Sequence, residues 1–451
     1  MSAERIQRGD LTHGTVWKAI LIFAFPLLIG NILQQTYNLV DSIIVGQFLG
    51  KEALAAVSAS FFIYYFIIAL VIGIGSGITV VVSQYYGARR YEQVQRAFSS
   101  SLIFMTITGI LLSVVGIVLA EPFFRLTHTP ADVLPQAVRY FRIYMGGTCL
   151  FIIFNSIISI LRGIGDSKLP MLFILVTVVL NVLLSLLFII VFQWGIEGVA
   201  FATILAQGAG MCIALAYMRK RHPILSIRKK DFVFDRKIFL QGLKIGFPTS
   251  IQQCSIAVGL IALLSLVNSF GTDMLTAYGA AGKVDTLVTQ AILTLSSALS
   301  AFCGQNIGAG HYDRVRKGLY SSMAINLFFC FIFLSVFYFF GKDIMQVFTG
   351  DENVIAIGYE YLLIIGSFLL IHGTLNILNG ALRGAGDTLF TMVTSLITFW
   401  LARIPLAYYL SGLWGRTGIW WAVNISITVG LIATAIYYKT GKWKTKSIIR
   451  N

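Results

Sequence analysis

The sequence predicts an all-α polytopic membrane protein whose twelve transmembrane helices form two six-helix bundles, related by a pseudo-twofold axis along the membrane normal. Three observations predict this class. Hydrophobic residues make up 57% of the 451 residues and charged residues only 12%, with a mean hydropathy of +0.82. Apolar runs of about 20 or more residues, the length that spans a bilayer as a helix, separate clusters of charge. Finally, motifs of the first half recur in the second half in the same order.

The apolar runs predict helices, because backbone groups in lipid must form hydrogen bonds within their own segment or within a closed barrel. A soluble domain carries about 25% charged residues, so this chain cannot cover a surface that faces water. No small-residue cleavage site follows the first run, so we expect no cleavable signal peptide. We expect spans at 16–46, 53–85, 98–119, 138–161, 170–192, 196–217, 238–269, 275–304, 319–340, 355–380, 389–410 and 417–438.

The distribution of positive charge predicts the orientation of the chain. The net charge is +15, and a strongly basic connection, "RKRHPILSIRKKDFVFDRKIFLQGLK", joins the sixth and seventh spans. Few Lys and Arg residues fall in the alternate loops, which predicts a multi-pass plasma (inner) membrane protein with cytoplasmic N- and C-termini. Anionic lipid headgroups account for the basic tracts, so we expect the bilayer and no nucleic acid as partner. We expect a monomer.

An internal repeat predicts the domain organisation. "LRGIGDSK" begins at Leu161 and "LRGAGDTL" at Leu382, so the two motifs lie close to half the chain length apart. At the same offset "SQYYGARRYEQV" aligns with "GQNIGAGHYDRV", and Phe25–Pro26 meets Phe247–Pro248 with a one-residue slip. Each half has six spans, an even number, so both halves enter the membrane in the same direction, as in transporters built from parallel repeats. We expect an N-lobe at 1–218, a basic cytoplasmic linker at 219–237, and a C-lobe at 238–451 with a basic C-terminal tail.

The duplicated Arg-Gly-x-Gly-Asp motif lies between the fourth and fifth spans of each half. Its glycines allow a left-handed residue to end one helix, and its Asp can cap the next. Gly-x-Gly-Asp also resembles the signature of intramembrane aspartyl proteases, which need two facing carboxylates. Asp166 and Asp387 lie at charged loop edges, and no earlier span has a tyrosine-aspartate partner. We therefore interpret the motif as a duplicated interhelical turn.

Residues that break the repeat are better candidates for chemistry in one half. Of the 19 acidic residues, 17 lie in loops, termini or span edges, and two, Asp41 and Asp285, lie deeper within spans. The repeat places Tyr64 opposite Asp285 and an apolar segment near Ala262 opposite Asp41. A carboxylate at this depth is costly unless it is paired, hydrated or protonated. Such a group can bind and release a proton or another cation as its surroundings change, which predicts a site for a coupling ion.

Polar residues at helical spacing surround the stronger candidate, Asp41. Gln34, Asn38 and Asp41 share a helix face, with Tyr37 beside it, and Pro26 earlier in the same span permits a bend and is our hinge candidate. Neutral oxygens on the fifth and sixth spans can complete the site, and they suit H⁺ or Na⁺ better than a transition metal. Each of them can instead serve helix packing. These residues are Asn181, Ser185, Thr203 and Gln207.

The second half offers weaker candidates. Asp285 lies two residues from Lys283, a spacing that does not place the two side chains face to face, so either a site or a structural ion pair is possible. Gln252 lies in the seventh span. The histidines and the five cysteines form no cluster, and no Walker loop is present. We therefore expect no enzymatic activity and no cofactor beyond a coupling H⁺ or Na⁺, with Asp41 as the only possible Na⁺ site.

Several segments together resemble the multidrug and toxic compound extrusion (MATE) family from about residue 12 to 440. They are "NLVDSIIVGQFLGKEALAAVSAS", "GQNIGAG", the paired "LRGxGD" turns and "WGIEGVAFATILAQ". The resemblance implies two six-helix lobes around a central cavity and export of amphipathic, often cationic, drugs in exchange for sodium ions or protons. It also implies that Asp41 serves cation coupling, with Asn181 and Thr203 as neighbours.

One residue departs from the family pattern. Many members have a second Asp four residues after the fifth-helix Asn, where this chain reads "NVLLSLLF" with Ser185. The loss of that carboxylate argues against a tight sodium cage and slightly favours protons. In the seventh span, Gln252 and Gln253 stand where some branches have Glu, so coupling in the C-lobe would use Asp285.

We therefore expect a secondary active multidrug efflux antiporter that exchanges drug-like small molecules for protons or sodium ions. The alternative is a lipid-linked precursor flippase of the same broad superfamily. Such flippases tend to have more spans and a basic cavity for pyrophosphate, whereas only Lys283 and Arg403 fall inside the spans expected here. An intramembrane enzyme is a third possibility, which the absence of a catalytic set disfavours.

Overall fold

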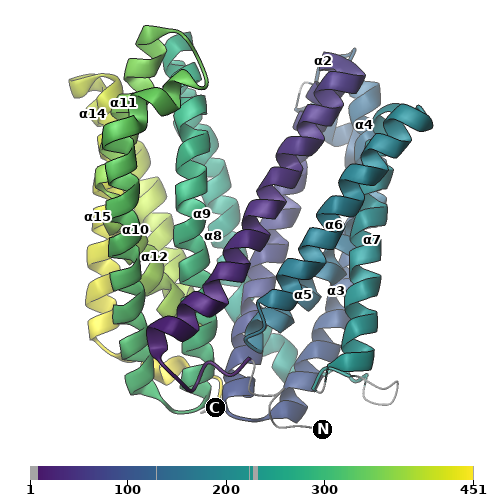
Figure 1. Ribbon diagram of the computed structural model, residues 1–451, viewed down its shortest axis with the longest axis vertical. Helices are drawn as coiled ribbons and strands as arrows, with labels where there is room; N and C mark the ends of the chain where they lie inside the picture. The colour runs from purple at the N-terminus through teal and green to yellow at the C-terminus, as the bar shows by residue number, and fades with distance from the viewer. Residues whose placement is uncertain (1–8, 128, 223, 227–231, 450–451) are drawn as a thin grey trace. The chain divides into compact units, whose positions relative to one another are not determined.

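The computed structural model describes residues 9–127, 129–222, 224–226 and 232–449, and in these ranges the regular structure is helical (Figure 1). The elements of the first half are α2 (Val16–Gly87), α3 (Tyr91–Leu126), α4 (Leu134–Gly146), α5 (Thr148–Gly163), α6 (Lys168–Leu186), η1 (Leu187–Val191) and α7 (Gly195–Arg221). Those of the second half are α8 (Arg236–Asn268), α9 (Thr272–Gly308), α10 (Tyr312–Gln346), α11 (Glu352–Ser367), α12 (Leu369–Gly384), α13 (Thr388–Leu396), η3 (Ile397–Arg403), α14 (Ile404–Trp414), α15 (Arg416–Lys439) and η4 (Lys442–Lys446).

These helices account for the twelve predicted spans. In the described chain nine helices are long and apolar enough to cross a membrane, or up to eleven if each bent pair counts as one span. The bent pairs are α4 with α5, at 47°, and α11 with α12, at 49°. Helix α2 has 72 residues, about 108 Å at 1.5 Å per residue, and Gly50 breaks it with a φ of 84° and a ψ of −176°. Because the hydrocarbon core is only about 30 Å thick, α2 holds the first two predicted spans.

The chain forms two compact units whose boundaries differ from the expected lobes. The first unit contains Phe25–Gly246, and the second contains Leu11–Ala24 and Phe247–Asn451. The start of α2 therefore belongs to the second unit, and the start of α8 belongs to the first. The exchange occurs beside Pro26 and Pro248, the duplicated prolines. Each proline lacks the N–H that would bond to the preceding turn, which makes a helix easiest to redirect there.

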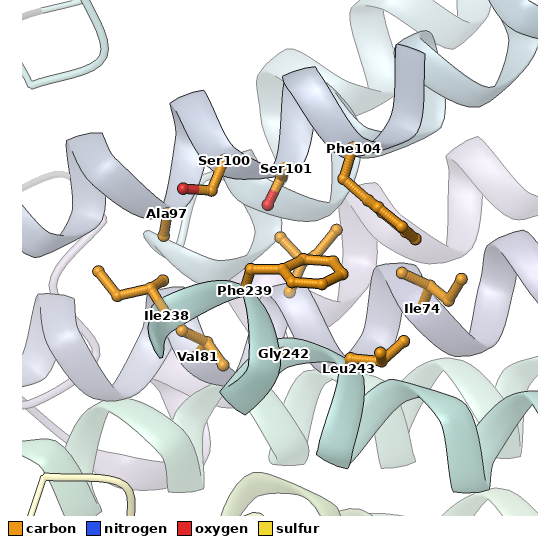
Figure 2. A pocket seen from close by; sticks show the side chains of 11 residues that line it. Ile74, Val81, Ala97, Ser100, Ser101, Phe104, Ile238, Phe239, Gly242 and Leu243 are labelled. Carbon is orange, nitrogen blue, oxygen red and sulfur yellow. The ribbon is translucent and has the colours of Figure 1, made fainter. Parts of the chain in front are cut away.

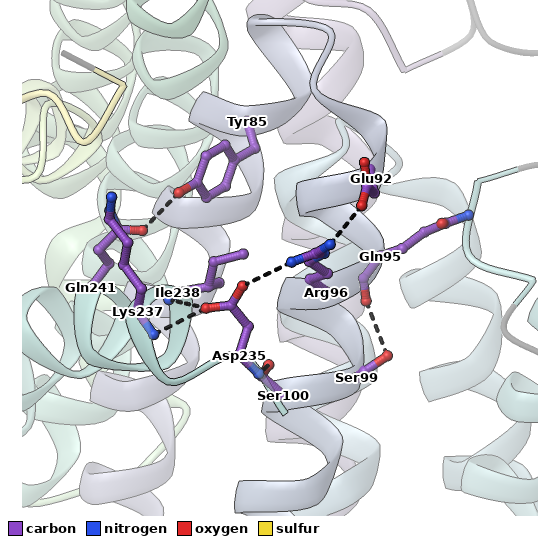
Figure 3. Close-up of polar contacts among 10 residues, drawn as sticks. All are labelled: Tyr85, Glu92, Gln95, Arg96, Ser99, Ser100, Asp235, Lys237, Ile238 and Gln241. Carbon is purple, nitrogen blue, oxygen red and sulfur yellow. Dashed lines mark hydrogen bonds and ion pairs between the residues drawn. The ribbon is translucent and has the colours of Figure 1, made fainter. Parts of the chain in front are cut away.

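In the first unit, polar contacts hold the start of α8 (Figure 3). Tyr85 of α2 donates a hydrogen bond to Gln241 Oε1 at 2.8 Å. Ser100 Oγ of α3 accepts the backbone N–H of Asp235 at 2.8 Å, and Arg96 lies 3.5 Å from the Asp235 carboxylate. Gln95 of α3 also donates a hydrogen bond to the backbone carbonyl of Ile224, which lies in the linker, at 2.8 Å. The basic residues expected there, Arg228, Lys229 and Lys230, lie outside the described residues.

Apolar contacts complete the docking of α8 in the first unit. Figure 2 shows Phe239 directed into a small cavity between α2 and α3, where its ring centroid lies 4.5 Å from that of Phe104. Two glycines bring the helices close together, because a Cβ on Gly77 would lie 2.3 Å from the Gly242 carbonyl oxygen. The α8 segment from Arg236 to Gly246 thus packs like a core helix of this unit.

In the second unit, side chains from α9 and α10 hold the segment that precedes α2. Gln305 Oε1 accepts the backbone N–H of Leu11 at 2.9 Å. Arg314 donates to the carbonyls of His13 and Gly14, both at 3.0 Å, and to Asn306 Oδ1 at 3.0 Å. Gln305 and Asn306 belong to the duplicated "GQNIGAG" segment. This motif of the second half therefore holds the N-terminal segment that precedes α2.

The outer surface of the helices is as apolar as the interior. Phe331 and Phe339 of α10 are 71% and 72% exposed. Buried apolar residues pack around Phe124 and Phe141 in the first unit and around Trp420 and Met345 in the second. Exposed aromatic rings on this scale are expected where lipid, not water, contacts the helices.

The duplicated turn combines two different uses of glycine. Gly165 and Gly386 have φ angles of 84° and 91°, which confirms the predicted left-handed residue at the end of each helix. The preceding glycines allow close helix packing, because a Cβ on Gly163 would lie 2.9 Å from the Thr79 carbonyl oxygen and one on Gly384 would lie 2.4 Å from that of Ser300. Thr79 and Ser300 occupy the same position of the repeat, so the same packing occurs in both units.

The aspartates of the motif behave differently. Asp166 Oδ1 accepts the backbone N–H groups of Lys168 and Leu169 at 3.0 Å each, as predicted for a cap. The capping prediction is wrong for Asp387, which caps no backbone N–H and instead accepts a hydrogen bond from Tyr437 of α15. The residue at the position of Tyr437 in the first half is Ala216, which offers no hydroxyl.

Candidate functional site

Asp41 is buried inside the first unit, where α2 meets α6. Its side chain is 8% exposed, and Ser185 Oγ donates a hydrogen bond to Asp41 Oδ1 at 3.4 Å across 144 residues of sequence. No ion pair joins Asp41 to a Lys or Arg in the described part of the chain. The carboxylate therefore lies in a low-dielectric region with a neutral hydroxyl, not a cation, as its polar contact.

The other predicted neighbours form a hydrogen-bonded group one helical turn away. Asn181 Nδ2 donates to Thr203 Oγ1 at 3.1 Å, and the Tyr37 and Thr203 hydroxyls share a hydrogen bond of 3.3 Å. The Thr203 hydroxyl in turn donates to the Val199 carbonyl of its own helix at 3.1 Å. Helices α2, α6 and α7 thus bring together residues that lie far apart in the sequence. We call Tyr37, Asp41, Asn181, Ser185 and Thr203 the Asp41 cluster.

Three tyrosines that were not predicted as site residues lie beside this cluster; Tyr64 and Tyr140 are buried, and Tyr144 is half-buried. The rings of Tyr64 and Tyr144 meet edge to face at 4.6 Å, and those of Tyr140 and Tyr144 lie 5.7 Å apart. Tyr140 and Tyr144 are close enough to interact electrostatically with Asp41. The segment "RYFRIY" is the only sequence signal for the two α4 residues, and tyrosine is too common at membrane interfaces for that signal to be specific.

A small polar cavity of about 30 Å³ adjoins the Asp41 cluster. Gln34 and Tyr37 of α2 line it, together with Asn181 of α6. The Asn38 side chain, in contrast, is exposed. The inward face of α2 therefore contains Gln34, Tyr37 and Asp41, and Asn38 lies at its edge. Successive helical residues rotate by about 100°, so a four-residue step carries Asn38 about 40° past Gln34.

Asp285 and Gln252 lie in the second unit. The Tyr361 hydroxyl donates to Asp285 Oδ2 at 3.4 Å, and Thr289 donates to Oδ1 at 3.5 Å. Gln252 donates to Ser395 Oγ of α13. Lys283 is exposed, lies near the Phe348 ring and forms no ion pair with Asp285 in the described chain, so the structural ion pair considered from the sequence is not formed.

Aromatic rings enclose the Asp285 region. Tyr361 meets Trp420 edge to face with centroids 4.7 Å apart, and Tyr278 stacks on Trp420 at 5.6 Å. Arg403, in the π-helical turn η3, donates to Ser426 Oγ at 3.1 Å, and its guanidinium lies 4.3 Å from the Phe399 ring centroid. Asp41 in the first unit is buried and Asp285 in the second is half-buried, and both lie beside tyrosines, although the two acids occupy different positions of the repeat.

The oxygen atoms of the Asp41 cluster suit a proton or a weakly bound monovalent cation. The described residues contain no group of three or more His, Cys, Asp or Glu side chains placed to hold a metal ion. Asp41 supplies the single carboxylate, and Ser185 supplies a neutral hydroxyl. The Thr203 hydroxyl is already hydrogen-bonded to Asn181 and to the Val199 carbonyl, so these side chains leave few oxygens, Asn181 Oδ1 among them, for a complete sodium shell.

Comparison with known families identifies the family of this chain. The MatE family model matches residues 26–187 and, a second time, residues 248–409. The chain belongs to the MatE family. Because one model matches both halves, the predicted internal repeat and the predicted family are confirmed. The two matches begin at Pro26 and Pro248, which agrees with the one-residue slip of the repeat at Phe247–Pro248.

Relatives match nearly the whole chain. A protein of Bacillus subtilis (strain 168) named probable multidrug resistance protein YpnP is 32% identical over 440 residues, which cover 97% of this chain and 98% of that protein. The probable multidrug resistance protein YoeA of the same organism is 30% identical, with 100% and 99% covered. A solved structure described as the outward-facing conformation of a multidrug resistance MATE family transporter has a TM-score of 0.90 at 23% identity and covers 96% of this chain. The predicted two-lobe, twelve-helix fold class is thus confirmed, and the protein is a multi-pass membrane protein of a multidrug efflux family.

Proposed function

We propose that this protein is a secondary active exporter that exchanges amphipathic, often cationic, small molecules for a cation bound in the Asp41 cluster. The observation that carries the proposal is the buried Asp41 carboxylate without an ionic partner among the described residues. An ionised carboxylate in this position is destabilised, and binding a proton or Na⁺ removes that cost. Cation occupancy then shifts the equilibrium between two conformations if the site has different affinities in them.

Protons are the coupling ion that the composition of the site favours. A sodium ion takes several oxygen ligands, whereas a proton needs one carboxylate oxygen and a hydrogen-bond acceptor. In this cluster Asp41 is the single carboxylate and Ser185 is neutral, and the Thr203 hydroxyl is already engaged by Asn181 and Tyr37, which leaves Asn181 Oδ1 as a neutral oxygen without a hydrogen bond in the described structure. An inward proton also gains about 2.3 kcal/mol per 100 mV of membrane potential, which supplies a driving force for export. Cytoplasmic termini, expected from the charge distribution, fit this direction of transport.

A reconstituted system tests the proposal. Purified protein in liposomes is given either a pH gradient without sodium or a sodium gradient at equal pH, and uptake of the cationic dye ethidium is followed. We expect the pH gradient to drive ethidium movement by the wild type. Asp41→Asn should lose gradient-driven transport while its thermal unfolding curve stays close to that of the wild type.

Asp285→Asn is the matched control, because it removes the half-buried acid that lies beside tyrosines in the second unit. If coupling resides in the Asp41 cluster, this variant retains gradient-driven transport. Full transport by Asp41→Asn contradicts the proposal, and transport driven only by the sodium gradient contradicts the choice of ion. Movement of a labelled lipid-linked precursor without ethidium movement would instead support the flippase alternative.

A further inference from the structure

The cavity beside the Asp41 cluster contains polar atoms that no protein group satisfies. Arg162, Asn181 and Gln207 all line this cavity of about 30 Å³. In the described structure, Arg162 Nε, Asn181 Oδ1 and Gln207 Oε1 are buried and have no hydrogen-bond partner. Three such atoms from three helices, α5, α6 and α7, meet around one space. Buried polar groups in native proteins are almost always bonded, so something must occupy this space.

The repeat shows why Arg162 lacks a protein partner. Its counterpart in the second unit, Arg383, donates through Nη2 to Ser296 Oγ at 2.9 Å, although its Nε is also unpaired. The residue at the position of Ser296 in the first unit is Gly75. A Cβ at Gly75 would lie 2.6 Å from Ser159 Oγ, so a serine there would require the Ser159 hydroxyl to move. The duplicated arginine therefore has a hydroxyl partner in one unit and faces a cavity in the other.

The size and the polarity of the cavity fit water. A buried water molecule needs roughly 10–15 Å³ of accessible volume and two to four polar partners. The cavity offers about 30 Å³, one unpaired donor and two unpaired acceptors. Water can both donate and accept, so it satisfies all three atoms even if the oxygen and nitrogen of an amide are interchanged. A metal cation is disfavoured, because the Arg162 guanidinium already places a positive charge on the cavity wall.

The same cavity wall belongs to the Asp41 cluster. Asn181 lines the cavity and bonds to Thr203 through Nδ2, which leaves its Oδ1 unpaired in the described structure, and Tyr37 lines the cavity while it bonds to Thr203. We propose that the cavity is an internal water site, anchored by Arg162, Asn181 and Gln207, which hydrates the coupling cation as it enters and leaves Asp41. Its role in coupling rests on the proposed function, whereas its occupancy by water does not.

Hydroxyl-radical labelling of the full-length protein in lipid nanodiscs tests the occupancy. X-ray radiolysis in H₂¹⁸O splits bound water and labels the side chains next to it. Phe154 lines the cavity and Phe141 lies in the apolar core of the same unit, with exposures of 4% and 2%. We expect Phe154 to acquire label several-fold faster than Phe141. Equal and slow labelling of the two rings would overturn the proposal.

Variants identify the anchors. Arg162→Met and Gln207→Leu remove one polar group each at similar volume, and both should lower the labelling of Phe154 towards that of Phe141. Arg383→Met is the matched control, since it alters the equivalent arginine of the second unit and should leave Phe154 labelling unchanged. Unchanged labelling in both first-unit variants would refute the assignment of the anchors. Gln207→Leu keeps the test valid if Arg162→Met fails to fold.

Transport measurements separate this proposal from the proposed function. If the water site serves coupling, Gln207→Leu slows ethidium movement driven by a pH gradient and leaves ethidium binding at equal pH unchanged. If Asp41→Asn transports normally while Phe154 is still labelled quickly, the coupling role fails and the water site stands. If Asp41→Asn is inactive and Phe154 is labelled no faster than Phe141, coupling stands and the water site fails. An anionic ligand in the cavity, detected as displacement of the label by added carboxylate, would also overturn the proposal.

Discussion

Replacing the first glycine of each duplicated turn by alanine tests the helix packing that the motif produces. A Cβ at Gly384 would lie 2.4 Å from the Ser300 carbonyl oxygen and 2.8 Å from Cys303 Cβ, so backbone must move. A Cβ at Gly163 would lie 2.9 Å from the Thr79 carbonyl oxygen and 2.8 Å from the side chain of Val82. We expect Gly384→Ala to be destabilised and Gly163→Ala to be close to neutral.

The magnitude follows from the missing space. Ordinary contact begins at 3.4 Å, so the backbone oxygen is too close by about 1.0 Å at Gly384 and by about 0.5 Å at Gly163. Overpacking of a close-packed interior costs about 1–3 kcal/mol, and we assign the upper value to Gly384 and the lower value to Gly163. Alanine in a helix recovers up to about 1 kcal/mol relative to glycine. The net loss is therefore about 2 kcal/mol for Gly384→Ala and close to zero for Gly163→Ala.

Thermal unfolding in detergent, followed by tryptophan fluorescence, measures the effect. One kcal/mol shifts Tm by about 2–4 °C in a domain of 150–250 residues, so Gly384→Ala should lower Tm by several degrees. Gly279→Ala in α9 is the control, because nothing lies within 4 Å of its added Cβ, and it should leave Tm unchanged or raise it. A Tm of Gly384→Ala at or above that of the wild type would refute the close approach. A larger loss for Gly163→Ala would refute the ranking.

Three further predictions concern segments outside the spans. Gly165 has a φ of 84°, in the left-handed region, so Gly165→Ala should lower Tm by an amount that corresponds to about 1 kcal/mol. Gly165→Asn should lower Tm by less, because Asn tolerates this conformation. Asp166→Ala removes the cap of α6 and should cost about 1 kcal/mol, seen as faster hydrogen exchange at the start of that helix. Burial lowers the pKa of His222 from 6.5 to about 4, and its neutral Nδ1 accepts the Leu225 N–H. Between these pH values the unfolded turn binds a proton at His222 that the folded turn does not, so the stability of the folded turn falls as the pH falls. Hydrogen exchange of the Leu225 N–H, corrected for the intrinsic rate, should therefore be faster at pH 5 than at pH 7.5.

Much of the fold could be predicted because lipid leaves few choices. Long apolar runs in a chain with 12% charged residues allow only helices, and the repeat sets their number and orientation. The exchange of the helix starts could not be predicted in this way. Hydropathy assigns each run to its place along the chain, whereas the docking of α8 depends on pairs such as Tyr85 with Gln241, which have no sequence signature.

The candidate site was predictable to the extent that buried polar residues are rare in spans. Asp41, Asn181, Ser185 and Thr203 lie at helical spacing in apolar surroundings, and the structure brings them together. Arg162 was missed because the expected span ended at residue 161, so the arginine was interpreted as part of a loop. Helix α5 continues to Gly163, which places Arg162 on its last turn, inside the unit.

Differences between the two copies of a motif reside in the partners more than in the motif itself. Arg162 and Arg383 occupy the same position, but Gly75 stands in one unit where Ser296 binds the arginine in the other. Asp166 and Asp387 also correspond, yet only Asp387 meets a tyrosine hydroxyl. A buried arginine without a partner is an unsatisfied polar group that is costly to keep. The proposed water site supplies the partner that Gly75 does not offer to Arg162, and Tyr37 and Asn181 of the Asp41 cluster line the same cavity in the described structure.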